Sequence, residues 1–381
     1  MELVVAIDAS RNRSGGARAH IIGILSQCDP VKNGIKEIHV WAFRELLDQI
    51  PSRPWLIKHS PPALEKNLVR QLIWQAKDLA KELRSLGCHI LFSTSASSVC
   101  RFSPMVSLSQ DMLSYEPGAM KNYGYGSSRL RLLCILVLQN LTFRRSQGVI
   151  FLSYYAGDVI QKSCGSLRNV AYIPHGVNDI FAESELRQCW PEAEERPVSC
   201  IYVSNIDMYK HQWHVIDAIS YLRDRGYKLT LKLVGGEASA TAEKLVKSAI
   251  KKSVDEGDFV SRIEFISHDK IPALLSDSDL FLFASSCENM PVTLIEGMSV
   301  GLPIVCSDRG PMPEVLMDGG VYFDPEDARS IADAVERVLC SPDLRSSISS
   351  KAKALSLQYN WKRCSDDTFK YIAKVCTETT F

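Results

Sequence analysis

Residues 281–316 read FLFASSCENMPVTLIEGMSVGLPIVCSDRGPMPEVL, and this stretch decides the fold class. Phe281 to Ala284 is a short apolar run of the kind that forms a buried strand. Pro291 suits the first turn of a helix, and it biases Met290 toward the extended backbone of an N-cap. A second apolar run, 303–306, follows the helix. A strand, a helix and a strand in this order predict a parallel βαβ unit.

The same alternation extends over the whole chain, and only a loop rich in Glu, Pro and Arg, Glu183 to Pro197, interrupts it. Strands are predicted at 3–7, 37–41, 89–92, 105–108, 148–152 and 170–173, and then at 199–203, 230–234, 262–266, 280–284, 303–306 and 321–323. Helices are predicted at 67–86, 211–225, 328–339 and around 366–375. The chain of 381 residues therefore reads as α/β, with two doubly wound, Rossmann-like domains and a boundary near the loop.

Composition excludes several classes of protein. Lys plus Arg and Asp plus Glu are 44 each, so no net field gathers polyanions, and we expect no nucleic-acid partner. The 12 cysteines form no Cys-x-x-Cys pair, which predicts reduced thiols in a cytoplasmic protein. The start MELVVAIDAS predicts no secretory signal. The most apolar stretch, 132–138, is far shorter than the ~18 residues of a membrane span.

The predicted helix that starts at about Pro291 suggests a phosphate site. The amides of Val292 and Thr293 and the positive end of the helix dipole favour an anion there. Glu288 lies just before this site and Glu296 lies within the helix, and carboxylates are good acceptors for sugar hydroxyls. The combination suggests a nucleotide sugar as ligand. For either glutamate alone, a structural role in solvent or at the helix start is the alternative.

The spacing of Glu288, seven residues and Glu296, followed by GMSVGLPIV and PEVL, resembles the E-x7-E block of retaining GT-B glycosyltransferases of family 4. This resemblance implies two Rossmann-like domains that face a cleft, with a C-terminal helix that crosses back to the first domain. We expect an acceptor domain at 1–180, a donor domain at 181–355 and the crossover helix at 356–381.

The resemblance also implies roles for individual residues. It assigns Glu296 to the nucleotide ribose and Glu288 to the donor sugar. The backbone between them would bind sugar and phosphate, through Asn289, Met290, Pro291, Val292 and the adjoining Thr293.

A second segment, VSNIDMYKHQWHVIDAI at 203–219, places Lys210 between a strand and a helix. The family has a Gly-Arg pair after this strand and a lysine five residues after the Arg. Lys210 matches that lysine, but Ser204 and Asn205 stand where Gly-Arg is expected. Lys210 is then the single full positive charge on the donor diphosphate, or another cation replaces the arginine. A surface lysine near a helix start is the alternative.

Three further positions in the first half resemble family sites. Gly15 and Gly16, after Ser14, correspond to a Gly-Gly loop that lines the cleft, although a plain turn explains them equally well. The segment matches neither G-x-G-x-x-G nor a P-loop, which argues against a dinucleotide or ATP. Gln110 stands where relatives carry a His near the donor sugar. His175 stands where the family has an Asn at the domain junction. It is either a hinge residue near the cleft or a histidine in a turn whose hydrogen bonds are satisfied locally.

Two other features leave alternatives open. His211 and His214 are three residues apart on a helix and could share a metal, but no acidic third ligand is near, and a pair without metal is favoured. The segment RLRLLCILVLQNLTFRR at 129–145 is apolar with basic ends. It is either a buried helix or a helix on a membrane surface.

The prediction is a retaining, metal-independent hexosyltransferase that needs no cofactor. It would move a hexose, with mannose one candidate, from a nucleotide-diphosphate sugar to a hydroxyl of a glycan or lipid-linked glycan. Glu288, Lys210 and Gln110 would lie closest to the chemistry. A sugar-nucleotide epimerase and a non-catalytic nucleotide-sugar-binding subunit are the alternatives. We expect a cytoplasmic location, with peripheral contact on the inner face of the membrane as an open possibility.

Overall fold

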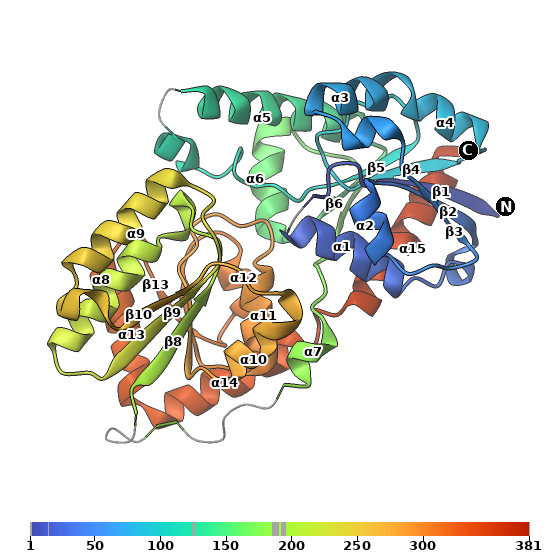
Figure 1. Ribbon diagram of the computed structural model, residues 1–381. Helices are drawn as coiled ribbons and strands as arrows, with labels where there is room; N and C mark the ends of the chain where they lie inside the picture. Colours follow the sequence, from blue (N-terminus) through green and yellow to red (C-terminus); the bar gives the residue numbers. More distant parts are fainter. Residues whose placement is uncertain (1, 14, 124–125, 185–189, 192–195, 381) are drawn as a thin grey trace. The chain divides into compact units, whose positions relative to one another are not determined.

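The computed structural model describes residues 2–13, 15–123, 126–184, 190–191 and 196–380 (Figure 1). The chain divides into two compact units. Unit 1 comprises Met1–Gly176 together with Tyr359–Phe381, and unit 2 comprises Val177–Gln358. Each unit contains one parallel β-sheet with helices on its faces, so the prediction of two Rossmann-like units is confirmed.

Unit 1 contains a seven-stranded sheet of order β3-β2-β1-β4-β5-β6-β7. Its strands are β1 Leu3–Asp8, β2 Ile35–Trp41, β3 Leu56–His59, β4 Ile90–Ser93, β5 Met105–Leu108, β6 Gly148–Phe151 and β7 Val170–Tyr172. Most central strands are buried on both faces, which is why they read as continuous apolar runs. The edge strand β3 was not predicted, because its sequence LIKH alternates with polar residues.

The helices of unit 1 are α1 Gly15–Ser26, α2 Arg44–Gln49, α3 Leu68–Lys77, α4 Leu79–Ser85, α5 Ser127–Arg145, α6 Tyr154–Cys164 and α15 Trp361–Thr380. Short 3₁₀ turns are η1 Val31–Asn33, η2 Pro62–Glu65 and η3 Ala119–Tyr123. The single helix predicted over 67–86 is interrupted at Asp78. The indole N–H groups of Trp41 in β2 and Trp74 in α3 both donate to Glu82, at 2.8 and 2.9 Å, which ties α4 to the sheet and to α3.

The C-terminal helix α15 belongs to unit 1, as predicted. It packs against α1, where a Cβ atom on Gly23 would lie only 2.3 Å from the Trp361 indole. Ser365 also donates a hydrogen bond to the Ile24 carbonyl at 2.8 Å. The close approach therefore requires a glycine on α1, and it fastens the end of the chain to unit 1.

Unit 2 contains a six-stranded sheet of order β10-β9-β8-β11-β12-β13. Its strands are β8 Val198–Val203, β9 Leu229–Val234, β10 Val260–Ile263, β11 Leu280–Phe283, β12 Ile304–Ser307 and β13 Val321–Phe323. Its helices are α7 Asp179–Ala182, α8 Gln212–Asp224, α9 Ala240–Lys252, α10 Ile271–Ser276, α11 Val292–Val300, α12 Met312–Leu316, α13 Ala328–Cys340 and α14 Pro342–Ser356, with 3₁₀ turns η4 Met208–Lys210, η5 Val254–Gly257 and η6 His268–Lys270. The order of connection reverses between β8 and β11, and such switch points are where doubly wound sheets bind ligands.

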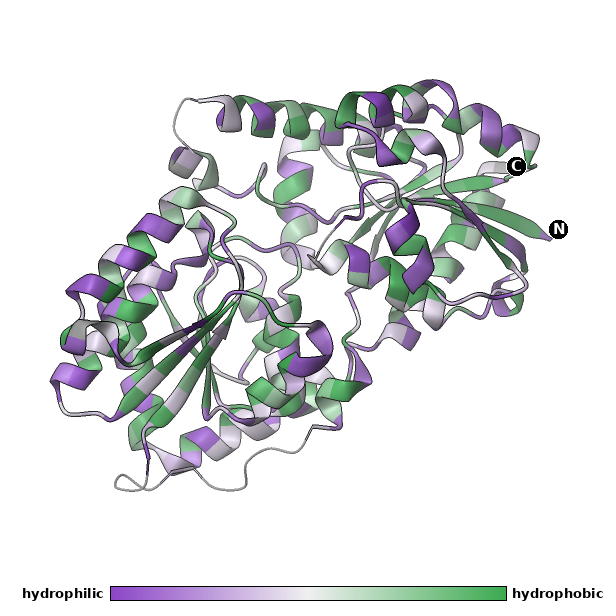
Figure 2. Cartoon of the chain, in the orientation of Figure 1, coloured by the Kyte–Doolittle hydropathy of each residue, from purple (hydrophilic) through white to green (hydrophobic). Residues whose placement is uncertain are grey.

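Hydropathy follows this layering, since the strands of both sheets are predominantly apolar and the helices are mixed (Figure 2). Within the described ranges, no helix has both the length and the apolar character that a membrane crossing requires.

Candidate functional site

Lys210 and Glu288 meet at the switch point of unit 2. Lys210 ends η4, in the loop after β8, and Glu288 lies in the loop after β11, the strand beside β8. The Lys210 ammonium forms an ion pair with Glu288 Oε1, and the two side chains are only 12% and 15% exposed. The Lys210 Nζ atom also lies 5.0 Å from the centre of the Tyr209 ring and 5.5 Å from that of Phe283. A freely solvated surface lysine, the alternative considered above, is therefore wrong.

Hydrogen bonds hold the backbone of the loop after β8. The Tyr202 hydroxyl donates to the Lys210 carbonyl at 2.8 Å, and Asp207 caps η4 by accepting from the Met208 amide at 2.7 Å. His211 follows with a left-handed backbone, φ 52°, before α8 begins. Because non-glycine residues rarely adopt this backbone, the contacts around the loop must stabilise it.

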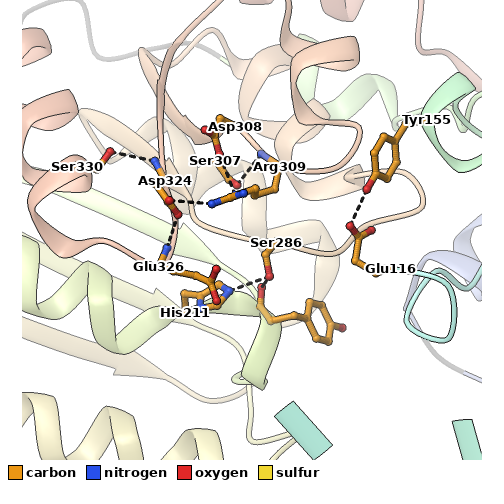
Figure 3. Close-up of polar contacts among 11 residues, drawn as sticks. Glu116, Tyr155, His211, Ser286, Ser307, Asp308, Arg309, Asp324, Glu326 and Ser330 are labelled. Atoms are coloured by element: carbon orange, nitrogen blue, oxygen red, sulfur yellow. Dashed lines mark hydrogen bonds and ion pairs between the residues drawn. The ribbon is translucent and has the colours of Figure 1, made fainter. Parts of the chain in front are cut away.

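Two hydrogen bonds join this loop to the loop after β11. The Ser286 amide donates to the Tyr209 carbonyl at 2.8 Å. The Ser286 hydroxyl and His211 Nε2 share a hydrogen bond of 2.8 Å (Figure 3). Burial lowers the pKa of His211 to about 4, so its ring is neutral at physiological pH. Hydrogen bonds thus join the two loops that carry Lys210 and Glu288.

Glu296 is a buried carboxylate in α11. It is 2% exposed, and its Oε1 atom lies 2.7 Å from His268 Nε2 in η6. Burial raises the pKa of Glu296, whereas the hydrogen bond to Glu296 raises the pKa of His268. The second carboxylate oxygen, Oε2, is buried and has no hydrogen-bond partner within the described residues. A helix glutamate in solvent, the alternative considered for Glu296, is wrong.

The start of α11 differs from the prediction. Pro291 is the N-cap residue and not the first helical residue, because its backbone, φ −82° and ψ 77°, forms a tight γ-turn. In that turn the Val292 amide donates to the Met290 carbonyl at 3.0 Å. The prediction that this amide is free to bind an anion is therefore wrong. The anion-site prediction then rests mainly on Thr293 and the helix dipole. Asn289, Met290 and Pro291 are all buried.

Asn205 lies in the same loop as Lys210, on its exposed part. Its carbonyl accepts a hydrogen bond from the Gln212 side chain at 2.9 Å. A Cβ atom on Gly235 would lie 2.3 Å from the Ser204 carbonyl oxygen, and Gly235 has φ 137°. The close packing of the loops after β8 and β9 thus requires glycine at position 235.

A second cation lies at the carboxyl ends of these strands. Arg309 follows β12, and its guanidinium contacts Asp324 at 2.7 Å and Asp308 at 3.2 Å (Figure 3). The positive charge of Arg309 contributes to the lowered pKa of His211. Sequence reasoning missed Arg309 and His268, because nothing in the local pattern marks either residue. Only the order of the strands brings them to this edge of the sheet.

The remaining predicted residues lie in unit 1. Gly15, with φ 57°, and Gly16 begin α1, and Ser14 lies outside the described residues. Gln110 is partly buried after β5, and its Nε2 atom has no hydrogen-bond partner among the described residues. Nearby in the chain, Glu116 accepts a hydrogen bond from Tyr155 at 2.6 Å (Figure 3).

His175 is buried, and its Nδ1 atom lies 2.8 Å from Nδ1 of His20 in α1. Burial lowers the pKa of both histidines, that of His175 to about 3. One ring must therefore carry its proton on Nδ1 and the other must accept it. The Trp361 ring, at 5.8 Å from that of His175, closes the cluster.

The described residues contain no group of three or more His, Cys, Asp or Glu side chains arranged to hold a metal. The rings of His211 and His214 stack at 5.9 Å, and burial lowers the pKa of each.

Comparison with known proteins identifies the class. The chain has the fold of the sucrose-phosphate synthase from Thermosynechococcus elongatus, with a TM-score of 0.79, 15% identity, and coverage of 99% of this chain and 100% of that one. It also matches the Anabaena protein HepE, solved in complex with UDP and glucose, with a TM-score of 0.70, 18% identity and full coverage of both chains. The fold is therefore that of GT-B glycosyltransferases, as predicted.

A family model matches the part of the chain that forms most of unit 2. Residues 183–355 match the family model described as glycosyl transferases group 1, so the predicted resemblance to a glycosyltransferase is confirmed at the level of this group. The alpha-D-kanosaminyltransferase of Streptomyces kanamyceticus is 30% identical over 175 residues. That match covers 45% of this chain and 44% of the relative, so it spans less than half of the relative's length.

Proposed function

We propose that the protein transfers a hexose from a nucleotide-diphosphate sugar to a hydroxyl group of a glycan or lipid-linked glycan, with retention at the anomeric carbon and without a metal. The observation that carries this proposal is the burial of the Glu296 carboxylate with one oxygen unpaired. Glu296 is 2% exposed, one of its oxygens contacts His268, and the other has no partner among the described residues. Such burial costs free energy unless a ligand donates a hydrogen bond to the second oxygen. A ribose hydroxyl is a donor of the required kind.

The ion pair of Lys210 and Glu288 supports the same ligand. Each charge neutralises the other, and the two side chains are only 12% and 15% exposed. A diphosphate would take over Lys210, and Glu288 would then be available to a hydroxyl of the donor sugar. The contact of Lys210 with Glu288 at one switch point supports the proposal that the pair binds the diphosphate and the sugar of one donor.

The proposed step is a same-face substitution. The bond between the anomeric carbon and the diphosphate oxygen breaks, and the acceptor oxygen bonds to that carbon. The departing phosphate takes the acceptor's proton. Because the sugar becomes oxocarbenium-like and the diphosphate gains charge, Lys210 and the start of α11 would stabilise the leaving group. Gln110 is proposed to contact a sugar hydroxyl, and Gly15 and Gly16 to line the site.

The related proteins support a nucleotide-sugar donor, since HepE was solved with UDP and glucose and the matched Streptomyces protein is named a kanosaminyltransferase. The choice of sugar and acceptor for this chain is a matter for experiment.

The test is a thermal-shift panel of UDP, GDP, ADP and their sugars, followed by transfer assays with the labelled sugar that binds. We expect one nucleotide series to stabilise the wild type and the Asp333→Asn control, which removes an exposed carboxylate on α13, and to stabilise Glu296→Gln less at the same nucleotide concentration. Stabilisation by none of the nucleotides would overturn the proposal. Conversion of the sugar nucleotide without acceptor would indicate an epimerase, and binding without any turnover a non-catalytic subunit.

A further inference from the structure

The outer face of α5 in unit 1 is apolar, against the usual pattern of a helix that covers a sheet. Leu130, Leu133, Val137 and Leu141 are between 43% and 64% exposed, and Cys134 is exposed among them. At about 100° per residue these five positions fall within a stripe of roughly 100° on the helix surface. Single exposed leucines are common, but a continuous row along a whole helix marks an interaction surface.

The buried face of the same helix is mixed and not wholly apolar. Gln139 and Thr142 point inward and are buried, together with Leu132 and Phe143. Thr142 donates to the Ser98 carbonyl at 3.1 Å, so the polar contact anchors the helix to the unit. Exposure of four large aliphatic side chains along one helix is unfavourable in water, and burial of Leu132 and Phe143 on the other face does not explain it.

Charge identifies the kind of partner. The sequence of α5 contains Arg129, Arg131, Arg144 and Arg145 and no acidic residue. Helix α3 has the same combination of exposed aliphatic and basic side chains. Leu68 and Val69 are exposed, and the helix contains basic but no acidic residues. In a chain whose net charge is zero, two helices thus concentrate positive charge around exposed aliphatic side chains.

Helices α3 and α5 both form hydrogen bonds to the same short segment of backbone, Ser98 and Val99. The Gln75 side chain of α3 accepts from the Val99 amide at 3.1 Å, and Thr142 and Arg145 of α5 both donate to the Ser98 carbonyl. Both helices are therefore fastened to the same segment of unit 1, residues 98–99.

We propose that this surface, formed by the exposed faces of α5 and α3, docks on an anionic lipid bilayer. Aliphatic side chains along the middle of a helix with arginines at both ends fit the boundary between acyl chains and negatively charged headgroups. A helix of 19 residues, about 28 Å long, lies in that plane. A second copy of the chain fits less well, because a symmetric contact would bring two sets of arginines together. The proposal does not depend on the function proposed above.

The test is co-sedimentation of the full chain with phosphatidylcholine vesicles that contain or lack phosphatidylglycerol. We expect binding to the anionic vesicles at low salt, and much weaker binding to the neutral ones or at high salt. Val137→Asp should weaken binding at least about tenfold, since it places a charge in the middle of the stripe. The matched change Leu357→Asp, at a 69% exposed leucine of unit 2, should leave binding unchanged.

A second pair of variants tests whether the arginines contribute to binding of anionic vesicles. Arg131→Gln should weaken binding to anionic vesicles by roughly fivefold, whereas Arg337→Gln, at an exposed arginine of unit 2, should not. An environment-sensitive dye on Cys134 should shift to the blue on anionic vesicles, and the same dye on the exposed Cys340 should not.

Two outcomes would overturn the proposal. One is absence of binding to anionic vesicles at low salt by the folded wild type. The other is a dimer in solution that Val137→Asp dissociates, which would assign the surface to a second copy of the chain. Because unit 2 carries the proposed donor site, a failure here leaves nucleotide binding unaffected, and the two proposals fail separately.

Discussion

Glu296 and His268 lie 28 positions apart in the chain, and their side chains meet across 2.7 Å beside the switch point of unit 2. His268 is in the loop after β10, and Glu296 is in the helix after β11. The contact leaves one oxygen of a buried carboxylate without a partner among the described residues. His268 therefore orients Glu296 and partly offsets the cost of burying its charge, and two predictions depend on this pair.

Glu296→Gln should weaken binding of the nucleotide diphosphate by about 10- to 100-fold. The ribose hydroxyl would lose a charged acceptor, which contributes about 1.5 to 3 kcal/mol. Calorimetric titration measures this change, and Asp333→Asn is the control for loss of one carboxylate. Wild-type affinity in folded Glu296→Gln would remove Glu296 from the site.

His268→Gln should shift the pH dependence of nucleotide binding. Burial raises the pKa of Glu296, so binding that needs the carboxylate is lost as the pH falls through this raised pKa. Protonated His268 opposes that rise, and a neutral glutamine does not. The acid limb of the binding profile should therefore move to higher pH in His268→Gln. An unchanged limb with uniformly lower affinity would point to a merely structural role for His268.

Lys210→Ala should lower turnover by about a hundredfold or more and should weaken donor binding less. The diphosphate gains charge as the sugar leaves, so the loss falls mainly on the transition state. Lys251→Ala, an exposed lysine on α9, is the control. Asn205→Arg should do no harm, because Asn205 is exposed and its carbonyl, not its side chain, holds Gln212. Near-normal turnover of Lys210→Ala would contradict the assignment.

Exhaustive chelation with EDTA should leave sugar transfer intact. Lys210 and the start of α11 are proposed to offset the charge of the leaving diphosphate without a divalent cation. The measurement is the transfer rate before and after chelation, with added magnesium or manganese as the comparison. A complete loss that either ion restores would show that these groups do not suffice.

His175→Asn should make the fold less sensitive to acid. Burial depresses the pKa of both His20 and His175 in the folded state. His175 therefore costs no stability above about pH 6.5, where an unfolded histidine is neutral, and it destabilises the fold as the pH falls below that value toward about 3. In that window His175 lowers the free energy of unfolding by up to about 1.4 kcal/mol per pH unit. Denaturant unfolding between pH 8 and 5 should show a shallower loss for His175→Asn, and an equal loss would contradict the prediction.

Much of the fold could be predicted from local pattern. The inner strands of both sheets, such as β4 and β11, are buried on both faces, and they therefore appear in the sequence as short apolar runs. The edge strand β3, with two polar residues in four, carried no such signal. Helix α14 was not predicted either, because serines and lysines obscure its periodicity.

Some features of the candidate site could likewise be predicted from the sequence, and others are visible only in the structure. Glu288 and Glu296 stand out through their spacing, and Lys210 through its place between a strand and a helix. That Lys210 and Glu288 form an ion pair, that His268 reaches Glu296, and that the Val292 amide is already bonded within a turn are results of the tertiary structure. The reason is physical: a strand or a helix depends on neighbours a few residues away, whereas these contacts depend on strand order and on side chains far apart in the chain. The outward direction of the apolar stripe on α5 belongs with them, because periodicity shows that a helix has two faces but only packing decides which one is buried.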